Sequence, residues 1–194
     1  MFYSIAKAIV WFFMHLIFRV RAAGVENIPK TGGVVLAVNH RSNWDVVMAG
    51  ITCPRQLTFM AKAELFKNKI FAALISSLGA FPIKRGSGDV GAYRAAMSIL
   101  RGERVMLMFP EGHRTKKGAS PARAKTGVAM FAIKAEVPVV PVYISGEYRW
   151  LGKVTVTYGA PITFEEHYGK KQSSEELQVI ADSILNKIRG LKEQ

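Results

Sequence analysis

Residues 34–45 read Val-Val-Leu-Ala-Val-Asn-His-Arg-Ser-Asn-Trp-Asp, an uncharged apolar run followed directly by a polar turn. The run is short and rich in β-branched side chains, which predicts a buried strand over residues 34–38 that delivers His40 into the turn. Asp45 comes five residues after His40, and two positions five apart on one α-helix diverge by roughly 140°. The two side chains can therefore meet only if the chain bends, as it does where a strand leads through a turn into a helix beginning near Asp45.

The rest of the chain alternates between apolar runs and stretches with helical spacing, which is typical of an α/β fold. Further strands are predicted at residues 57–61, 80–84, 105–109, 137–144 and 153–158, and helices at residues 68–77, 89–102, 122–135 and 173–190. Pro138 and Pro141 lack amide donors, which indicates an edge strand or an irregular ladder. Since the 194 residues contain no linker or repeat, we expect one domain, a mixed and largely parallel sheet flanked by helices.

The charge of the chain points to an anionic partner. Lysine and arginine total 27 against 14 acidic residues, a net charge of +13, which suits nucleic acid, phosphorylated metabolites or acidic lipid headgroups. Nucleic acid is disfavoured because aromatic residues are not interleaved with the basic runs, as a stacking platform requires. The one cysteine, Cys53, has no partner for an internal disulfide, which is compatible with a reducing compartment.

The first eighteen residues are almost wholly apolar. Between residues 2 and 18 only Ser4, Lys7 and His15 are clearly polar, and on a helical wheel they fall within roughly 80° of one another. A helix of this length rises about 25 Å, against roughly 30 Å of hydrocarbon in a bilayer, so a full span is marginal. A signal peptide is disfavoured because no small-residue cleavage site follows.

Two interpretations of this segment stay open, a buried core helix and a helix embedded in one leaflet of a membrane. We expect the second, with residues 1–21 forming a membrane-associating helix and residues 22–194 the remaining domain. In this arrangement Trp11 lies near the interface, and Lys7, Arg19 and Arg21 contact anionic headgroups.

His40 and Asp45 are the best candidates for chemistry. A carboxylate that holds one imidazole nitrogen lets the other act as a base near pH 7, although a purely structural hydrogen-bonded pair is an equally good interpretation of the spacing alone. Ser42 and Cys53 do not lie in a recognisable nucleophile arrangement, so we expect the attacking group to come from the substrate. The sequence has no second histidine at ligand spacing and no cysteine pair, so a metal site is poorly supported.

Basic residues follow two of the predicted strands. Arg85 precedes a glycine-rich turn, and Glu111-Gly112-His113-Arg114 follows the strand at residues 105–109. Guanidinium groups at the mouth of a sheet suit the binding of a phosphate. The alternative, solvated surface charge, fits Lys116 and Lys117 better than Arg85 and Arg114.

Residues 39–45 resemble the first motif of the glycerolipid acyltransferases, a histidine, four residues and an aspartate. Three further blocks resemble the second, third and fourth motifs of that family in order, namely residues 81–86 (Phe-Pro-Ile-Lys-Arg-Gly), 109–114 (Phe-Pro-Glu-Gly-His-Arg) and 137–142 (Val-Pro-Val-Val-Pro-Val). Residues 24–29 and 62–66 also match, so the resemblance covers residues 22–160. In size and layout the chain is most similar to the bacterial 1-acylglycerol-3-phosphate acyltransferases.

This resemblance implies a mechanism and a binding site. His40 is expected to remove a proton from the acceptor hydroxyl while Asp45 orients it, and the freed oxygen attacks an acyl thioester without an acyl-enzyme. The acceptor site is expected to comprise Lys62, Arg85, Glu111, Gly112 and Arg114, with the basic members holding the phosphate.

The resemblance also implies partners and a location. We expect a lysophospholipid acceptor, acyl carrier protein or acyl-coenzyme A as co-substrate, no metal or other cofactor, and an anionic membrane at the cytoplasmic face of the bacterial inner membrane. His113 stands where the third motif more often has threonine, which leaves the acceptor open. The alternatives are the same chemistry on lyso-ornithine lipid or lysophosphatidylglycerol, or a non-catalytic basic protein that binds membranes or nucleic acid.

Overall fold

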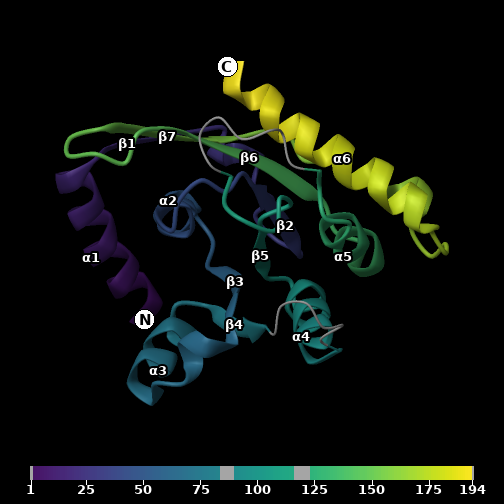
Figure 1. The fold of residues 1–194 in the computed structure, drawn as a ribbon, viewed down its shortest axis with the longest axis horizontal. Helices are drawn as coiled ribbons and strands as arrows, with labels where there is room; N and C mark the ends of the chain where they lie inside the picture. The colour runs from purple at the N-terminus through teal and green to yellow at the C-terminus, as the bar shows by residue number, and fades with distance from the viewer. Residues whose placement is uncertain (1, 84–89, 116–122, 194) are drawn as a thin grey trace.

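The computed structural model describes residues 2–83, 90–115 and 123–193, and these form one seven-stranded sheet with helices on both faces (Figure 1). The strands are β1 (Arg19–Ala23), β2 (Val34–Val38), β3 (Leu57–Lys62), β4 (Ala80–Ile83), β5 (Val105–Met108), β6 (Val139–Gly146) and β7 (Lys153–Tyr158). Their order is β1-β7-β6-β2-β5-β3-β4, and β6–β7 is the antiparallel pair. The predicted mixed, largely parallel α/β fold is confirmed.

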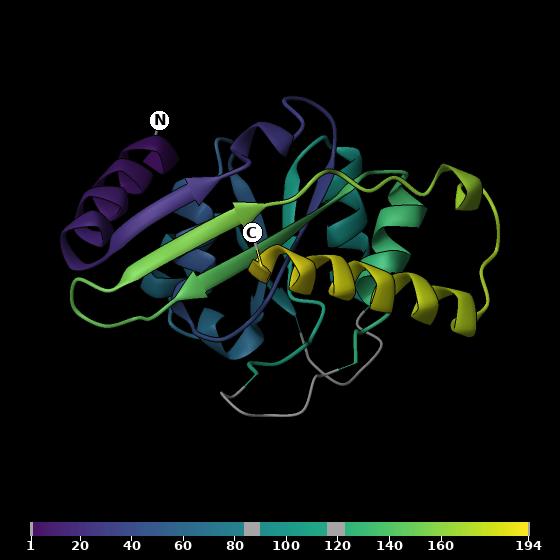
Figure 2. The same ribbon diagram turned by 90° about the horizontal axis from the view of Figure 1, so that it is seen from above.

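The helices alternate with the strands along the chain. They are α1 (Phe2–Ile17), α2 (Trp44–Thr52), α3 (Lys69–Ser77), α4 (Val90–Arg101), α5 (Gly127–Ala135) and α6 (Ser174–Gly190), with 3₁₀ turns η1 (Val25–Asn27), η2 (Ala63–Phe66), η3 (Glu165–His167) and η4 (Leu191–Glu193). Seen from above in Figure 2, β1, β7 and β6 run next to one another, with α1 beside β1.

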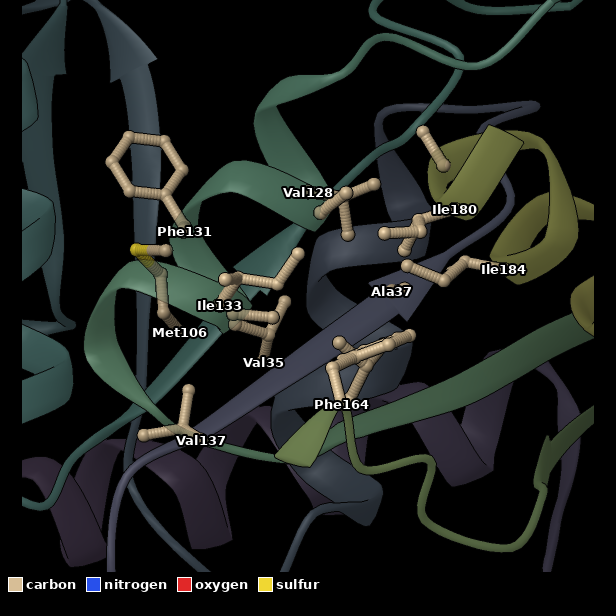
Figure 3. Close-up of a cluster of buried hydrophobic side chains, with 14 of the residues drawn as sticks. Val35, Ala37, Met106, Val128, Phe131, Ile133, Val137, Phe164, Ile180 and Ile184 are labelled. Atoms are coloured by element: carbon tan, nitrogen blue, oxygen red, sulfur yellow. The ribbon is translucent and has the colours of Figure 1, made fainter. Parts of the chain in front are cut away.

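Strand β2 is buried throughout because both faces of the sheet are covered. Side chains alternate across a strand, so Val35 and Ala37 pack with α4, α5 and α6 in the cluster shown in Figure 3, where Ile184 of α6 also lies. Val34 and Leu36 point to the other face and pack with α1 and α2. The uncharged run thus forms the centre of two cores.

The segment after α1 is a strand and not part of the helix. α1 ends at Ile17, and β1 pairs in parallel with β7, Arg19 lying opposite Lys153. The expected helix over residues 1–21 is therefore too long. Arginine, valine and arginine alternate with the period of a strand, and charged side chains are tolerated here because β1 is the edge of the sheet.

The strand β6, which begins after Pro138 and contains Pro141, lies inside the sheet, so of the two predicted alternatives the edge strand is wrong. β6 lies between β2 and β7. The Pro141 carbonyl accepts the Gly159 amide at 2.8 Å, one residue beyond the end of β7. The missing amide donor therefore falls where the ladder with β7 stops, and the ladder with β2 is preserved.

The start of the helix predicted over residues 122–135 changes. Helix α5 begins at Gly127 and not at residue 122, because the Ala124 amide donates to Asp182 and the Lys125 amide to the Pro110 carbonyl. The predicted caps and ends at Lys84, Asp89 and residue 122 lie outside the described residues.

Helix α1 turns its apolar side away from the domain. Six large apolar side chains on it are each about half exposed, namely Ile5, Ile9, Trp11, Phe12, Phe13 and Leu16. Lys7 points inward, where its ammonium donates to the Cys53 carbonyl at the end of α2, so the expected contact of Lys7 with headgroups is wrong. In the part of the chain that the structure describes, no helix is both long and apolar enough to cross a bilayer.

Candidate active site

Three of the predicted site residues lie at one edge of the sheet. His40 follows β2, Glu111 follows β5, and Lys62 ends β3, and these strands are neighbours that run in parallel. In open α/β sheets the carboxyl ends of adjacent parallel strands form the crevice that binds ligands. The topology therefore gathers residues that are far apart in the sequence.

Asn39 fixes the point at which the chain leaves β2. Its buried side chain bonds to the main chain of Ile144 in both directions, donating from Nδ2 at 3.1 Å and accepting at Oδ1 at 2.7 Å. The Asn39 amide makes a main-chain bond to the Val142 carbonyl of β6 at 3.3 Å, and the side-chain bonds extend this pairing with β6 by two residues. They anchor the turn that carries His40.

His40 and Asp45 meet through the predicted bend. His40 Nδ1 lies 3.0 Å from Asp45 Oδ2, and the same oxygen accepts the amides of Arg41 at 2.6 Å and Ser42 at 2.7 Å. Helix α2 begins at Trp44 and places Asp45 in its first turn, fully buried. The turn and the helix start thus hold the carboxylate against the imidazole.

The carboxylate of Asp45 is ionised near neutral pH. Burial raises the pKa of Asp45, but hydrogen bonds from His40, Ser42, Tyr148 and Arg41 outweigh it and hold the pKa below its ordinary value. An ionised carboxylate only accepts hydrogen bonds, so Nδ1 of His40 is the donor of the pair. Nε2 is left as the ring nitrogen able to take a proton.

The loop after β5 closes over the histidine. The Phe109 ring stacks on the His40 ring with centroids 3.8 Å apart and 14° between the planes. The Thr115 amide donates to the His40 carbonyl at 2.8 Å. The His40 side chain is 12% exposed, so the imidazole is held by Phe109 on one face and by Asp45 at Nδ1 yet reaches solvent.

Glu111 is a buried acid beside this pair. It is 7% exposed, and its Oε2 has no hydrogen-bond partner among the described residues. Burial raises the pKa of Glu111, and the His40 amide with the charges of Arg189, His40 and His113 partly opposes that shift. Buried carboxyl oxygens are normally hydrogen-bonded, so this one is available to a ligand.

Gly112 needs the conformational freedom of glycine. Its φ is +71°, and a Cβ there would approach the Lys125 side chain to 3.0 Å. The left-handed conformation turns the loop sharply after Glu111. Lys62, His113 and Arg114 are exposed at the same edge, whereas Arg85 lies outside the described residues.

Tyr148 belongs to the site and carried no signal in the sequence. Its hydroxyl donates to Asp45 Oδ1 at 2.7 Å across 103 positions of the chain. It lies in the turn between β6 and β7, outside every motif noted above.

Among the described residues no three histidine, cysteine or acidic side chains gather to hold a metal ion.

A histidine–carboxylate pair stands at the carboxyl ends of the strands of a mixed α/β sheet, an arrangement able to take part in proton transfer. The Acyltransferase family model matches residues 19–145. The chain belongs to this family.

Two bacterial acyltransferases are similar to the chain in sequence. The chain is 33% identical over 177 residues to 1-acyl-sn-glycerol-3-phosphate acyltransferase of Streptococcus pneumoniae, covering 87% of this chain and 64% of that protein. It is 36% identical over 130 residues to lyso-ornithine lipid O-acyltransferase of Pseudomonas aeruginosa, covering 66% of this chain and 48% of that protein. It thus spans less than two thirds of either relative.

The fold is similar to a crystal structure of the 1-acyl-sn-glycerophosphate (LPA) acyltransferase PlsC from Thermotoga maritima. The TM-score is 0.71 at 26% identity, with 97% of this chain and 77% of the other covered. The likeness thus extends over nearly all of this chain, beyond the residues that the family model matches.

Proposed function

We propose that this chain transfers a fatty acyl group from acyl-coenzyme A or acyl carrier protein to the free hydroxyl of a lysophosphatidic-acid-like acceptor, which yields phosphatidic acid. The observation that carries the proposal is the pair of His40 and the fully buried Asp45, whose Nδ1–Oδ2 distance is 3.0 Å. The relatives' names supply the substrate class.

In the proposed reaction Nε2 of His40 takes the proton of the acceptor hydroxyl, and the oxygen attacks the thioester carbonyl. The tetrahedral intermediate then expels the donor thiolate, which recovers the proton from the imidazolium. Asp45 stabilises that imidazolium while it exists and keeps Nδ1 as the donor. No residue of the chain is acylated.

The loop after β5 supports binding of the acceptor. The unpartnered Oε2 of Glu111 can hydrogen-bond a polar group of the acceptor beside His40. Arg114 and Lys62 are exposed cations at the same edge of the sheet and suit the phosphate. Arg85, which the second motif implies, remains a predicted member of this site.

We propose that the domain lies on an anionic membrane, at the cytoplasmic face of the bacterial inner membrane. The outward apolar side of α1 supports this, because a helix that turns its apolar residues to solvent is unfavourable unless lipid covers them. Ile70 of α3 is 85% exposed, with Leu65, Phe71 and Leu74 also exposed nearby. Lys67 and Lys69 flank this second apolar patch and suit acidic headgroups.

The test is acylation of lysophosphatidic acid in mixed micelles, with acyl-coenzyme A and acyl carrier protein as separate donors. We expect product with the wild type and a loss of about 10²–10⁴-fold in kcat for His40→Ala, the range that a general base contributes. His167→Ala is the matched control, because His167 lies in η3 and pairs with Glu166 at 3.5 Å. Near wild-type rates with His40→Ala would overturn the mechanism.

A second acceptor, lyso-ornithine lipid, is favoured by the 36% identity to the Pseudomonas aeruginosa enzyme. Mass spectrometry of products from a mixture of lysophosphatidic acid, lyso-ornithine lipid and lysophosphatidylglycerol separates the two. Exclusive acylation of lyso-ornithine lipid would replace the first acceptor and leave the chemistry unchanged.

A further inference from the structure

The two carboxylate oxygens of Asp45 have different surroundings. Oδ2 accepts hydrogen bonds from the His40 ring and from the amides of Arg41 and Ser42. Oδ1 accepts the Tyr148 hydroxyl at 2.7 Å. Because Asp45 is fully buried, each oxygen needs a donor from the protein, and for Oδ1 the structure supplies it from a distant turn.

Tyr148 is itself held by several elements. The Arg41 guanidinium lies 5.6 Å from the centroid of its ring, and the same side chain donates from Nη2 to the Gly146 carbonyl at 2.7 Å. The buried Phe18 ring packs edge-on against Tyr148, with centroids 5.7 Å apart and 79° between the planes. The position of the hydroxyl is thus fixed before any substrate binds.

The turn that carries Tyr148 is also tied to the end of α1. The Leu151 amide donates to the Ile17 carbonyl at 2.7 Å, and the Arg19 amide donates to the Gly152 carbonyl at 2.9 Å. The hydroxyl on Asp45 therefore depends on the junction between α1 and β1. This junction lies outside the four sequence motifs.

We infer that Tyr148 is a positioning residue for the reaction, which holds the Asp45 carboxylate so that its other oxygen orients His40 for proton transfer. This inference rests on the proposed function. Tyr148 remains a donor at all physiological pH values, because burial and then the charge of Asp45 raise the pKa of its phenol. Arg41, His40 and Glu111 are the other charged or titratable groups around this pair, and none of them donates to Oδ1 in the described contacts.

The experiment compares Tyr148→Phe with the wild type over a range of pH. We expect kcat to fall about tenfold, within the range for loss of a hydrogen bond to a charged group, and KM for the lysolipid to change less than about twofold because acceptor contacts remain. The lost bond raises the pKa of Asp45, so the acidic limb of kcat/KM should move to higher pH.

Tyr158→Phe is the matched control. Tyr158 is more deeply buried than Tyr148, and its hydroxyl contacts the other end of α2, bonding to Thr52 Oγ1 at 2.7 Å. Its loss should lower the unfolding temperature without moving the acidic limb. If both variants lose the same stability and activity with unchanged limbs, or if Tyr148→Phe keeps the wild-type kcat and limb, the inference is overturned.

His40→Ala, measured beside them, separates this inference from the proposed function. An active His40→Ala variant removes the general-base mechanism itself. An inactive His40→Ala variant together with a fully active Tyr148→Phe variant removes only the role of Tyr148.

Discussion

Helices α1 and α6 are nearly equal in length, at 16 and 17 residues, and lie on opposite sides of the sheet (Figure 1). They place their apolar residues in opposite ways. The apolar stripe of α6 is buried against the sheet and consists of Ile180, Ala181, Ile184, Leu185 and Ile188. On α1 Met14 is buried, whereas Ile9 and Phe12 on the outer side are about half exposed.

The difference teaches that an apolar stripe does not by itself say where a helix faces. α6 carries charged residues opposite its stripe, so water stabilises one side while the core takes the other. α1 has apolar residues nearly all round, and two of its polar side chains bond inward, Lys7 to the Cys53 carbonyl and the Tyr3 hydroxyl to the Leu57 amide. α6 therefore stabilises the fold, and we propose that α1 serves the membrane.

The largest effect should come from shortening a buried side chain of α6. Ile184 is fully buried in the cluster of Figure 3, and removing a buried isoleucine side chain to alanine costs about 2–5 kcal/mol. We expect Ile184→Ala to lower the free energy of unfolding by that amount in urea. Val179→Ala is the control, because Val179 is 69% exposed on the same helix and should change stability by less than about 0.5 kcal/mol. Equal effects would show that α6 is not part of the core.

Substitution on α1 should affect membrane binding and leave the fold intact. Phe12→Ser with Phe13→Ser removes two exposed rings, and burial of such a ring is worth about 1.5–3 kcal/mol when complete. We expect partition to vesicles containing phosphatidylglycerol, measured by co-sedimentation, to fall about tenfold to a hundredfold, since the rings are only partly exposed. The unfolding temperature should stay within about 2 °C.

The matched control for this variant is Val179→Ser, an apolar-to-serine change at an exposed position on α6. It should leave vesicle partition unchanged. If the α1 variant unfolds at a much lower temperature while partition stays the same, α1 is a core helix, the interpretation left open by the sequence.

Most of the sheet could be predicted because its strands are uninterrupted apolar runs buried on both faces. β1 could not, because an edge strand of charged and small residues lacks that pattern. The place of β6 in the sheet could not be predicted, because a proline within a strand indicates either an edge strand or an irregular ladder. Only the register shows that the missing amide donor of Pro141 falls beyond the end of β7.

Only part of the candidate site could be predicted from the sequence. His40 and Asp45 are close in the sequence, so the need for a bend between them could be worked out from helical geometry. The contact of Tyr148 spans 103 positions and depends on how the turn between β6 and β7 lies against the first turn of α2. The unpartnered oxygen of Glu111 depends equally on packing, because the same residues on an exposed loop would be solvated.

The smallest effect should come from the cap of α6. Ser173 Oγ accepts the Glu176 amide at 3.1 Å, and Glu176 Oε2 accepts the Ser173 amide at 2.7 Å, which is the predicted capping box. Ser173→Ala should cost about 1 kcal/mol in urea unfolding, well below the effect of Ile184→Ala, because packing and not the cap holds most of α6 in place.

The two halves of the box can be separated by pH. The Ser173 amide and hydroxyl lower the pKa of Glu176, so the contribution of this carboxylate is present above the ordinary pKa of glutamate and is lost as pH falls through the lowered value. Ser173→Ala should therefore destabilise at both neutral and acidic pH, whereas Glu176→Gln should destabilise only at neutral pH. Both variants should keep wild-type partition to vesicles, because the cap lies on the helix that serves the core. A loss of partition on breaking this cap would mean that α6, and not α1 alone, contacts the membrane.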